Sequence, residues 1–372
     1  MKNKVLFTDV VWFQEGPGIR LNQYTSTGIK LLNVSNLING KIDLSTSDRY
    51  ISKEEAYGKY KHFLVDENDF IIASSGIKVD YFEKKMGFVP KKDLPLCMNT
   101  STIRFKSLNK TILDIRYFMY FLKSNEFKRQ LNKQITGSAQ LNFGPSHLKK
   151  MFIPLIPLLE QKKIVNILDK INSLINIQED RIKAFDLLVK SRFREMFGDP
   201  ISQEKNIRLL TISKYCTLKA GKFVKASDIY LNKGNELYPC FGGNGLRGYV
   251  RTYTHIGEYP LIGRQGALCG NVKYATGKFH ATEHAIVVTP KIEINKRWLY
   301  MLLFQLKLNR YATGAAQPGL AVATLEKIHI QIPTLALQNE FADFVQRIDK
   351  SKYCRFDNFF IEVIFKTIKA NF

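Results

Sequence analysis

The chain has 372 residues, 45% of them hydrophobic, which is enough for two domains, and its five cysteines are too widely spaced for a disulfide frame or a zinc site. No apolar run approaches the ~18 residues of a membrane-spanning helix, and Asp9 interrupts the N-terminus before a signal-peptide core can form, so we expect a cytoplasmic protein without membrane contact. Fifty-six Lys and Arg against 33 Asp and Glu give a net charge of +23, which favours a polyanionic partner, usually nucleic acid.

Residues 1–157 predict a globular part of mixed strands and short helices. Strand-like apolar runs alternate there with loops rich in Gly, Ser and Asn, most clearly in 28–42 and 69–76. The side-chain amides of Asn and Gln can form two hydrogen bonds with the edge of adenine, and Lys pairs with phosphate. Such loops therefore suit DNA binding. The candidate DNA contacts in this part are Lys30, Asn33, Asn36, Ser74, Ser75, Lys78, Gln140 and Asn142.

A long helix is predicted from about Leu158 to Met196, within a segment that we place at 158–198. Its apolar residues follow alternating steps of four and three, which is the seam of a coiled coil and needs a partner helix. Gly198 and Pro200 supply its end. At ~1.5 Å per residue, a helix of about 39 residues spans roughly 58 Å. The seam positions are Ile164, Leu168, Ile171, Ile175, Ile182, Phe185 and Val189.

Residues 199–334 predict a second globular part with loops of its own. Arg can form two hydrogen bonds with the edge of guanine. Loops bounded by Gly, such as 263–266, let a DNA duplex come close to the backbone. The string from His280 to His284 matches the H-x-x-E-H pattern of zinc proteases, but its flanks predict strands, so we interpret it as strand packing or DNA contact. The candidate DNA contacts in this part are Lys222, Lys225, Asn244, Arg247, Arg264, Gln265, His284 and Gln317.

A second long helix is predicted from about Leu337 to Lys369, within a segment placed at 335–372. Its seam positions include Phe341, Val345 and Ile348, and the pattern slips near Lys352. We expect the two helices to pack antiparallel; the alternative is that each covers its own globular part. Residues 158–198 carry a net charge of +2 and 336–370 carry +1, which leaves +20 on the globular parts.

The chain repeats itself at an offset of 177 residues. The segment 136–140 (TGSAQ) corresponds to 313–317 (TGAAQ), and Gln161 corresponds to Gln338. An ordered series of such matches indicates a tandem duplication. Two globular readers at the ends of a ~58 Å spacer would sit about one and a half duplex turns apart, taking ~34–36 Å for a turn. That geometry predicts a target of two half-sites with an unread spacer.

Catalytic motifs are not evident in the sequence. It contains no phosphate-binding G-x-x-x-x-G-K-[ST] loop, no G-x-G-x-x-G after a strand, no N-P-P-[YF] run for adenine methylation, and no paired carboxylates at nuclease spacing. We therefore expect a chain without a catalytic centre, a metal or a cofactor of its own.

Taken together, these segments resemble the specificity subunits of type I restriction-modification systems. The likeness rests on the duplicated Thr-Gly-x-Ala-Gln segments, on 157–164 (PLLEQKKI), on 193–200 (FREMFGDP) and on the glycine-rich series 241–272. The C-terminal residues 352–372 depart from the Lys/Glu/Leu-rich helix usual in that family.

The resemblance implies an α/β (α+β) fold with two target recognition domains, 1–157 and 199–334, separated by the antiparallel helices 158–198 and 335–372. It further implies double-stranded DNA as ligand and two methyltransferase subunits docked on the helix seam. Translocase-nuclease subunits would join them. S-adenosylmethionine, ATP and Mg would belong to those partners and not to this chain.

Two other kinds of protein remain open. One is the recognition region of a single-chain restriction-methylation enzyme, which length and the lack of catalytic motifs disfavour. The other is a stand-alone DNA-binding regulator, which would bind tightly without any methyltransferase subunit.

Overall fold

The structure is a computed structural model that describes residues 3–46, 48–77, 79–134, 141–202, 209–314 and 318–353. These residues form two compact units: unit 1 extends to Asn176, and unit 2 begins at Ile177. The boundary falls inside helix α6 (Leu158–Phe197), because each half of this helix contacts a different unit. The predicted boundaries at 157 and 198 coincide with the ends of α6, and the predicted domains remain predictions.

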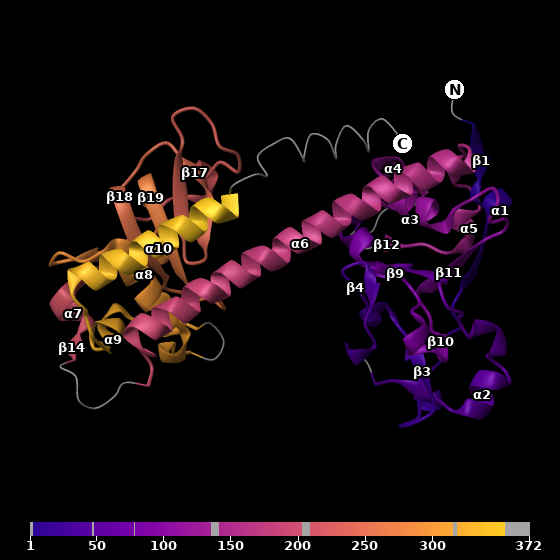
Figure 1. Ribbon diagram of the computed structural model, residues 1–372, viewed down its shortest axis with the longest axis horizontal. Helices are drawn as coiled ribbons and strands as arrows, with labels where there is room; N and C mark the ends of the chain where they lie inside the picture. Colours follow the sequence, from indigo (N-terminus) through magenta and orange to yellow (C-terminus); the bar gives the residue numbers. More distant parts are fainter. Residues whose placement is uncertain are drawn as a thin grey trace. The chain divides into compact units, whose positions relative to one another are not determined.

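Unit 1 is built from short strands and short helices (Figure 1). Its strands are β1 (Lys4–Leu6), β2 (Val11–Glu15), β3 (Ile29–Leu32), β4 (Leu37–Ile38), β5 (Lys41–Ile42), β6 (Tyr50–Ile51), β7 (Phe70–Ala73), β8 (Ser75–Ile77), β9 (Met86–Phe88), β10 (Leu96–Met98), β11 (Thr102–Ser107), β12 (Leu141–Asn142) and β13 (Phe152–Pro154). Its helices are α1 (Phe7–Val10), α2 (Lys53–Tyr57), α3 (Ile115–Lys123), α4 (Asn125–Gln134), α5 (Pro145–Leu148) and the first part of α6. Two sheets dominate, β2–β11–β7–β9 and β10–β3–β6.

Helix α3 shows how the sequence builds the core of unit 1. Asp114 caps it by accepting a hydrogen bond from the backbone N–H of Arg116 at 2.8 Å. Tyr117, Phe118 and Phe121 then fall on one helical face, and all three are fully buried. The ring of Phe118 packs edge-on against Phe7. The start of α6 joins the same core, so the long helix is anchored in unit 1 by apolar burial.

Unit 2 is built around one six-stranded sheet of order β15–β20–β18–β19–β16–β17. The strands of this unit are β14 (Leu210–Thr211), β15 (Cys216–Ala220), β16 (Tyr238–Gly242), β17 (Gly245–Val250), β18 (His255–Gly263), β19 (Val272–Ala281), β20 (Ala285–Pro290) and β21 (His329–Ile330). Its helices are α7 (Ile212–Tyr215), α8 (Lys296–Gln305), α9 (Val322–Glu326), α10 (Leu335–Tyr353) and the second part of α6.

The predicted duplication is confirmed by equivalent contacts in the two units. In unit 1, β1 pairs antiparallel with β13, and in unit 2, β14 pairs antiparallel with β21. Gln161 accepts a hydrogen bond from the backbone N–H of Asp114, which caps α3, at 2.9 Å. Its counterpart Gln338 accepts one from the N–H of Asn295, which caps α8, at the same distance. The same side chain thus ties the start of a long helix to the same place in each unit.

A pair of ion bridges repeats as well. Arg116 in α3 binds Asp169 of α6 at 2.8 Å, and Arg297 in α8 binds Asp349 of α10. Each bridge joins the first turn of the short helix to a residue that lies about three to four turns after the start of the long helix. The mixed helix and strand fold of two equivalent parts therefore follows the expectation from the sequence.

In unit 2, α6 and α10 pack antiparallel, as predicted. Lys352 pairs with Asp186 at 2.7 Å, and Glu340 pairs with Arg192 at 3.1 Å. The residue numbers rise along one helix where they fall along the other, so the two helices run in opposite directions. The ring of Phe193 meets that of Phe341 edge-on, with centroids 5.4 Å apart. Residues 354–372, where the second helix was predicted to continue, lie outside the described residues.

The predicted seam of α6 is buried at both ends and exposed in the middle. Ile175 is 40% exposed and Ile182 is 44% exposed, and Phe185 is half-buried. The seam positions that are buried are Ile164, Leu168, Ile171 and Val189 on α6, with Phe341 and Val345 on α10, while Ile348 is half-buried. The described residues therefore leave the middle of the seam uncovered.

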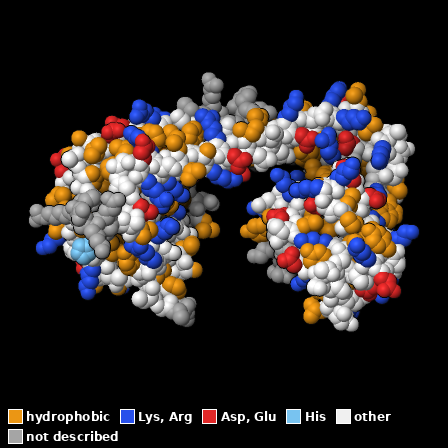
Figure 2. All heavy atoms as spheres, turned by 60° about the horizontal axis from the view of Figure 1, so that its bottom comes forward, with side chains coloured by type: hydrophobic (Ala, Val, Ile, Leu, Met, Phe, Trp, Pro, Cys, Tyr) orange, Lys and Arg blue, Asp and Glu red, His pale blue; other side chains and the backbone are white. Residues whose placement is uncertain are grey.

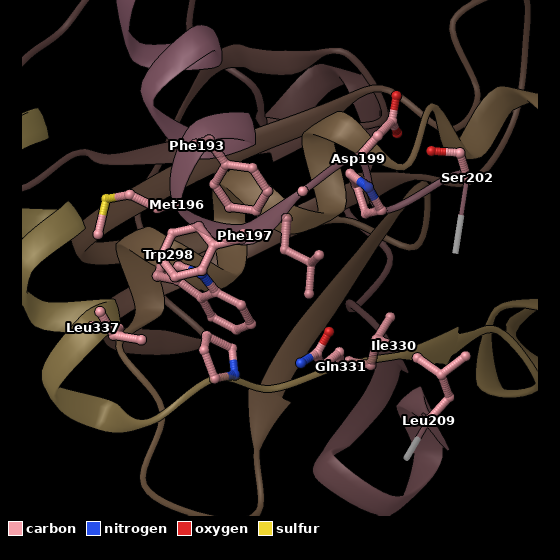
Figure 3. A pocket seen from close by; sticks show the side chains of 14 residues that line it. Phe193, Met196, Phe197, Asp199, Ser202, Leu209, Trp298, Ile330, Gln331 and Leu337 are labelled. Atoms are coloured by element: carbon pink, nitrogen blue, oxygen red, sulfur yellow. The ribbon is translucent and has the colours of Figure 1, made fainter. Parts of the chain in front are cut away.

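Aromatic packing closes the end of α6 in unit 2. Figure 3 shows the indole of Trp298 beside the rings of Phe193 and Phe197. A pocket of about 390 Å³ adjoins them, lined also by Met196 and Leu337. The indole N–H of Trp298 is buried and has no hydrogen-bond partner in the described part of the chain. The pocket is also lined by Ser202 and Leu209, between which the chain is not described, and we assign no ligand to it.

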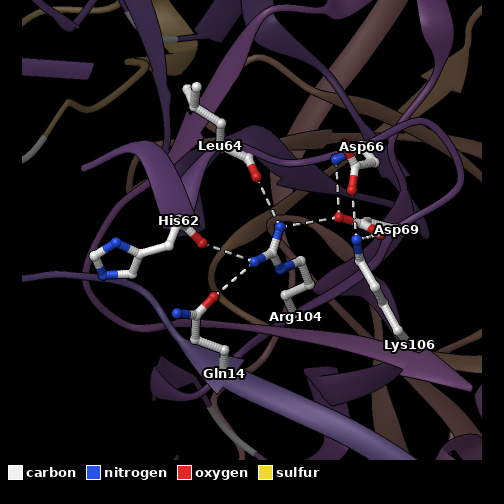
Figure 4. Close-up of polar contacts among 7 residues, drawn as sticks. All are labelled: Gln14, His62, Leu64, Asp66, Asp69, Arg104 and Lys106. Atoms are coloured by element: carbon white, nitrogen blue, oxygen red, sulfur yellow. Dashed lines mark hydrogen bonds and ion pairs between the residues drawn. The ribbon is translucent and has the colours of Figure 1, made fainter. Parts of the chain in front are cut away.

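A buried charge network centres on Arg104, in the larger sheet of unit 1 (Figure 4). Arg104 of β11 is 5% exposed and binds the carboxylate of Asp69 at 3.2 Å. Its guanidinium also donates to the side-chain oxygen of Gln14 and to the carbonyl oxygens of His62 and Leu64. These bonds fix the loop before β7, and β7 leads directly into Ser74 and strand β8.

Candidate nucleic-acid interface

In unit 1, the fold brings together the two loop segments that the sequence singled out. Strand β8, which follows Ser74, pairs antiparallel with β12, so that Leu141 lies opposite Ile77 and Asn142 opposite Ser75. The backbone N–H of Phe143 donates to the carbonyl oxygen of Ser74 at 3.0 Å. The segment after β7 therefore meets residues 141–143, which directly follow the first Thr-Gly-x-Ala-Gln segment in the sequence. Lys78 and Gln140 lie outside the described residues.

In unit 2, the equivalent segments meet in the same way. The loop after β18 begins at Arg264, whose carbonyl oxygen accepts a hydrogen bond from the N–H of Leu320 at 2.8 Å. Gly266 donates to the carbonyl oxygen of Pro318, and Gln265 bridges to Gly319. Residues 318–320, which directly follow the second Thr-Gly-x-Ala-Gln segment in the sequence, thus adjoin the Gly-bounded loop 263–266. Gln317 lies outside the described residues.

Further loops of unit 2 gather around this junction. The backbone N–H of Arg264 donates to the carbonyl oxygen of His284 at 2.9 Å, and that of Lys222 to Ala281 at 2.9 Å. The side chain of Asn271 donates to that of Asn244 at 2.8 Å. Loops 221–225, 242–247, 263–271 and 281–284 are therefore neighbours.

Glycine is required where these loops touch. A Cβ atom on Gly263 would lie 2.1 Å from the carbonyl oxygen of Gly243, which no larger residue tolerates. The β16–β17 turn and the end of β18 can approach this closely only because both positions lack side chains. This close approach brings the turn that carries Asn244 next to the residue before Arg264.

Six of the seven described candidates of unit 2 therefore lie on adjoining loops, and Arg247 lies near the start of β17. Lys222, Lys225, Asn244, Arg247 and Gln265 are exposed, and Arg264 and His284 are half-buried. Sequence reasoning missed Phe223, which is 70% exposed between Lys222 and Lys225. An aromatic residue flanked by lysines is the available signal for it, since aromatic faces stack on bases.

Unit 1 requires three corrections. Asn33 and Asn36 were predicted to contact DNA, but both are buried and bond within the chain: the Asn36 side chain accepts from the N–H of Asn33 at 2.9 Å, and the Asn33 side chain accepts from Asn99. Ser74 is also buried, at 1% exposed. Asn competes for local backbone bonds and so fixes turns, which explains the two asparagines.

The other described candidates of unit 1 lie nearer to solvent. Asn142 is exposed, while Ser75 is half-buried and bonds through its hydroxyl to Ser101 at 2.7 Å. Lys30 is half-buried, 3.6 Å from Asp48, and its ammonium lies over the ring of Tyr50. Asn142 is thus the clearest described contact candidate of unit 1.

The string from His280 to His284 lies at the end of β19 and in the turn to β20, so its histidines share no helical face. Among the described residues, no group of three or more His, Cys, Asp or Glu is placed to hold a metal. Three polar atoms here, His280 Nδ1, Thr282 Oγ1 and Glu283 Oε2, are buried without a described hydrogen-bond partner. Because such an atom costs ~1–3 kcal/mol, this turn suits a polar partner such as water.

Four of the described candidates of unit 2 are cations: Lys222, Lys225, Arg247 and Arg264. Burial lowers the pKa of His255, and the nearby charges of His280 and Lys222 lower it further. Figure 2 shows Lys and Arg side chains spread over the visible face of each unit, with apolar side chains between them. No helix within the described residues is long and apolar enough to cross a membrane.

Comparison with known proteins agrees with this arrangement. The family model described as "Type I restriction modification DNA specificity domain" matches residues 8–184 and again residues 208–353. The chain belongs to this family. Its two matches coincide with the duplicated halves.

Two relatives illustrate the likeness. The type I restriction enzyme EcoprrI specificity subunit of Escherichia coli is 34% identical over 63% of this chain and 61% of its own length. The MjaVIII specificity subunit of Methanocaldococcus jannaschii is 23% identical over 78% of this chain and 74% of its own length. The chain thus spans less than two thirds of the first of these relatives.

Solved structures show the same fold. A type I restriction-modification S subunit from M. genitalium has a TM-score of 0.58 at 16% identity, covering 99% of this chain and 93% of that one. A chain from a study of complex assembly and conformational transition of the type I R-M system has a TM-score of 0.53 at 16% identity, with coverages of 99% and 95%.

Proposed function

We propose that this chain is the DNA-reading, non-catalytic subunit of a type I restriction-modification complex. Each unit reads one half of a split target, and because the loops of the two units differ, the halves differ in sequence. The observation that carries the proposal is the repeated junction: in each unit, the segment after β7 or β18 pairs with the residues that directly follow the Thr-Gly-x-Ala-Gln segment. Gly, Asn, Arg and Gln on such junctions suit base edges.

The partners follow from the family and from the exposed middle of α6. Two methyltransferase subunits would dock on the long helices, and translocase-nuclease subunits would join them. S-adenosylmethionine, ATP and Mg would then be bound by those partners. The chain itself would bring no cofactor and would position the partners on the target.

Arg264 provides a direct test of the reading role. We expect the change Arg264→Ala, measured on the assembled methyltransferase, to relax specificity at one position of one half-site by ~1–3 kcal/mol, because a bidentate Arg–guanine contact is lost. Methylation rates on the target duplex and on every single-mismatch duplex measure this change. The purified chain alone is expected not to methylate.

Arg347 on α10 offers a matched control, since it is exposed and lies outside the loops described above. Arg347→Ala should leave the ranking of the duplexes unchanged. Equal losses on every duplex for Arg264→Ala would assign this side chain to the phosphate backbone. Robust methylation by the isolated chain would contradict the non-catalytic assignment.

A further inference from the structure

A basic groove lies beside the reading loops of unit 2. It has a volume of about 530 Å³, with walls from α6, the loop 267–272, the end of α8 and η8 (Leu308–Tyr311). Its cationic groups are Lys190 and Arg194 on α6 and Lys307 just before η8. None of the described residues that line it is Asp or Glu, so the groove attracts anions.

The three cations are largely available to a ligand. Neither Lys190 nor Lys307 forms an ion pair within the described part of the chain. The ammonium of Lys190 lies 5.1 Å from the ring centroid of Phe304, which orients it without neutralising it. Arg194 has one long ion pair, with Asp199 at 3.6 Å, and its side chain stays 50% exposed.

The walls of the groove are fixed before any ligand arrives. The side chain of Gln305 donates to the carbonyl oxygen of Lys190 at 3.1 Å and so ties α8 to α6. Gly270 has a φ of +80°, and a Cβ there would lie 2.3 Å from the backbone nitrogen of Asn309. The loop therefore packs directly on η8, and the cations are held on rigid elements.

The groove is continuous with the loops that carry Arg264 and Gln265. Asn271 lines the groove and donates its side-chain N–H to Asn244 in the β16–β17 turn. The N–H of Gly270 donates to the carbonyl oxygen of Gly263, the residue before Arg264. A duplex whose bases are read by these loops would therefore bring its backbone past the groove.

We propose that this basic groove binds the phosphodiester backbone of the DNA next to the half-site that unit 2 reads. The inference rests on the proposed function and adds to it, because α6 then takes part in binding DNA as well as in connecting the two units. An acidic surface of a partner protein is the competing occupant. Continuity with the reading loops favours DNA.

The test compares two triple variants of the full chain. Lys190→Gln, Arg194→Gln and Lys307→Gln remove the charges of the groove. The control, Lys214→Gln, Lys327→Gln and Arg347→Gln, removes the same number of exposed Lys and Arg charges elsewhere in unit 2. Fluorescence anisotropy with a random-sequence duplex of about 30 base pairs, across a salt series, gives the slope of log affinity against log salt for each.

We expect the groove variant to reduce the slope by about 2 to 3, since each phosphate contact contributes about 0.9, and the control to reduce it by less than about 0.5. The charge-preserving variant Lys190→Arg, Arg194→Lys, Lys307→Arg should restore most of the slope, which separates lost charge from a damaged fold.

Three outcomes would overturn the inference. Equal slopes for the groove variant and the control would overturn the inference. The proposed function would stay intact in that case, provided that the native chain binds the duplex. If the groove variant keeps the native slope but no longer co-purifies with the methyltransferase subunit, the groove binds an acidic protein partner. If the native chain shows no salt-dependent DNA binding, the proposed function fails as well.

Discussion

Arg104 is a buried cation with several polar partners. Its guanidinium stacks over the ring of Trp12, with 5.0 Å to the centroid, and pairs with Asp69, which is 4% exposed. A buried pair adds little stability by itself, because removing both charges from water is costly. Losing Arg104 is different, since Asp69 then keeps only Lys106, 3.3 Å away, as an ion partner, and the carbonyl oxygens of His62 and Leu64 lose their donor.

We therefore expect Arg104→Ala to lower the free energy of unfolding of unit 1 by about 3–5 kcal/mol. Chemical denaturation of the full chain measures this change. Arg129, whose side chain is 72% exposed in its pair with Glu126, is the matched control, and Arg129→Ala should cost less than about 1 kcal/mol. Adding Asp69→Asn to Arg104→Ala should recover part of the loss. Equal effects of Arg104→Ala and Arg129→Ala would contradict this account of the network.

The solvent exposure of single residues was predictable from the sequence where glycine bounded a loop, and their contact with DNA stays a prediction. Arg247, Arg264 and Gln265 lie near solvent because Gly-rich turns leave few apolar neighbours to bury them. Asn33 and Asn36 were not predictable in this way. An asparagine that hydrogen-bonds a turn and one that binds a base have the same sequence context, and only the fold shows which backbone groups are in reach.

At the level of elements, the long helix was the most predictable part of the chain. A heptad stripe with a Gly and Pro end specifies α6 to within a residue, because burial repeats with the helical period. The two-residue strands of unit 1 and its second sheet could not be predicted, since so short a pattern has no period. The groove residue Lys307 was missed for a related reason: it is distant in sequence from Lys190 and Arg194.

The length of α6 provides a prediction at this scale. We expect deletion of seven residues, 175–181, to shorten the unread spacer of the target by about three base pairs or to abolish activity, with unchanged half-site bases. Seven residues remove ~10.5 Å of helix and keep the heptad phase. A four-residue deletion, which breaks the phase, is the control and should abolish activity. The methylated motif of cells carrying each variant measures the effect, and an unchanged spacer at full activity would contradict it.

At the level of the whole molecule, duplication explains why the two units share contacts but not loops. The Gln161 and Gln338 bonds and the two Arg–Asp bridges keep each unit attached to its long helix in the same way. The loops differ, with a three-stranded sheet beside the main sheet of unit 1 and a six-stranded sheet in unit 2. A shared scaffold with different loops is what two independent readers require.

The central claim is that each unit reads its own half of one split target. Methylome sequencing of cells that carry this gene with its methyltransferase partner, before and after exchange of residues 199–333 for those of another family member, tests it most directly. The account predicts two different short half-sites around an unread spacer, of which the exchange alters only one. A continuous motif, or a change in both halves at once, would contradict it.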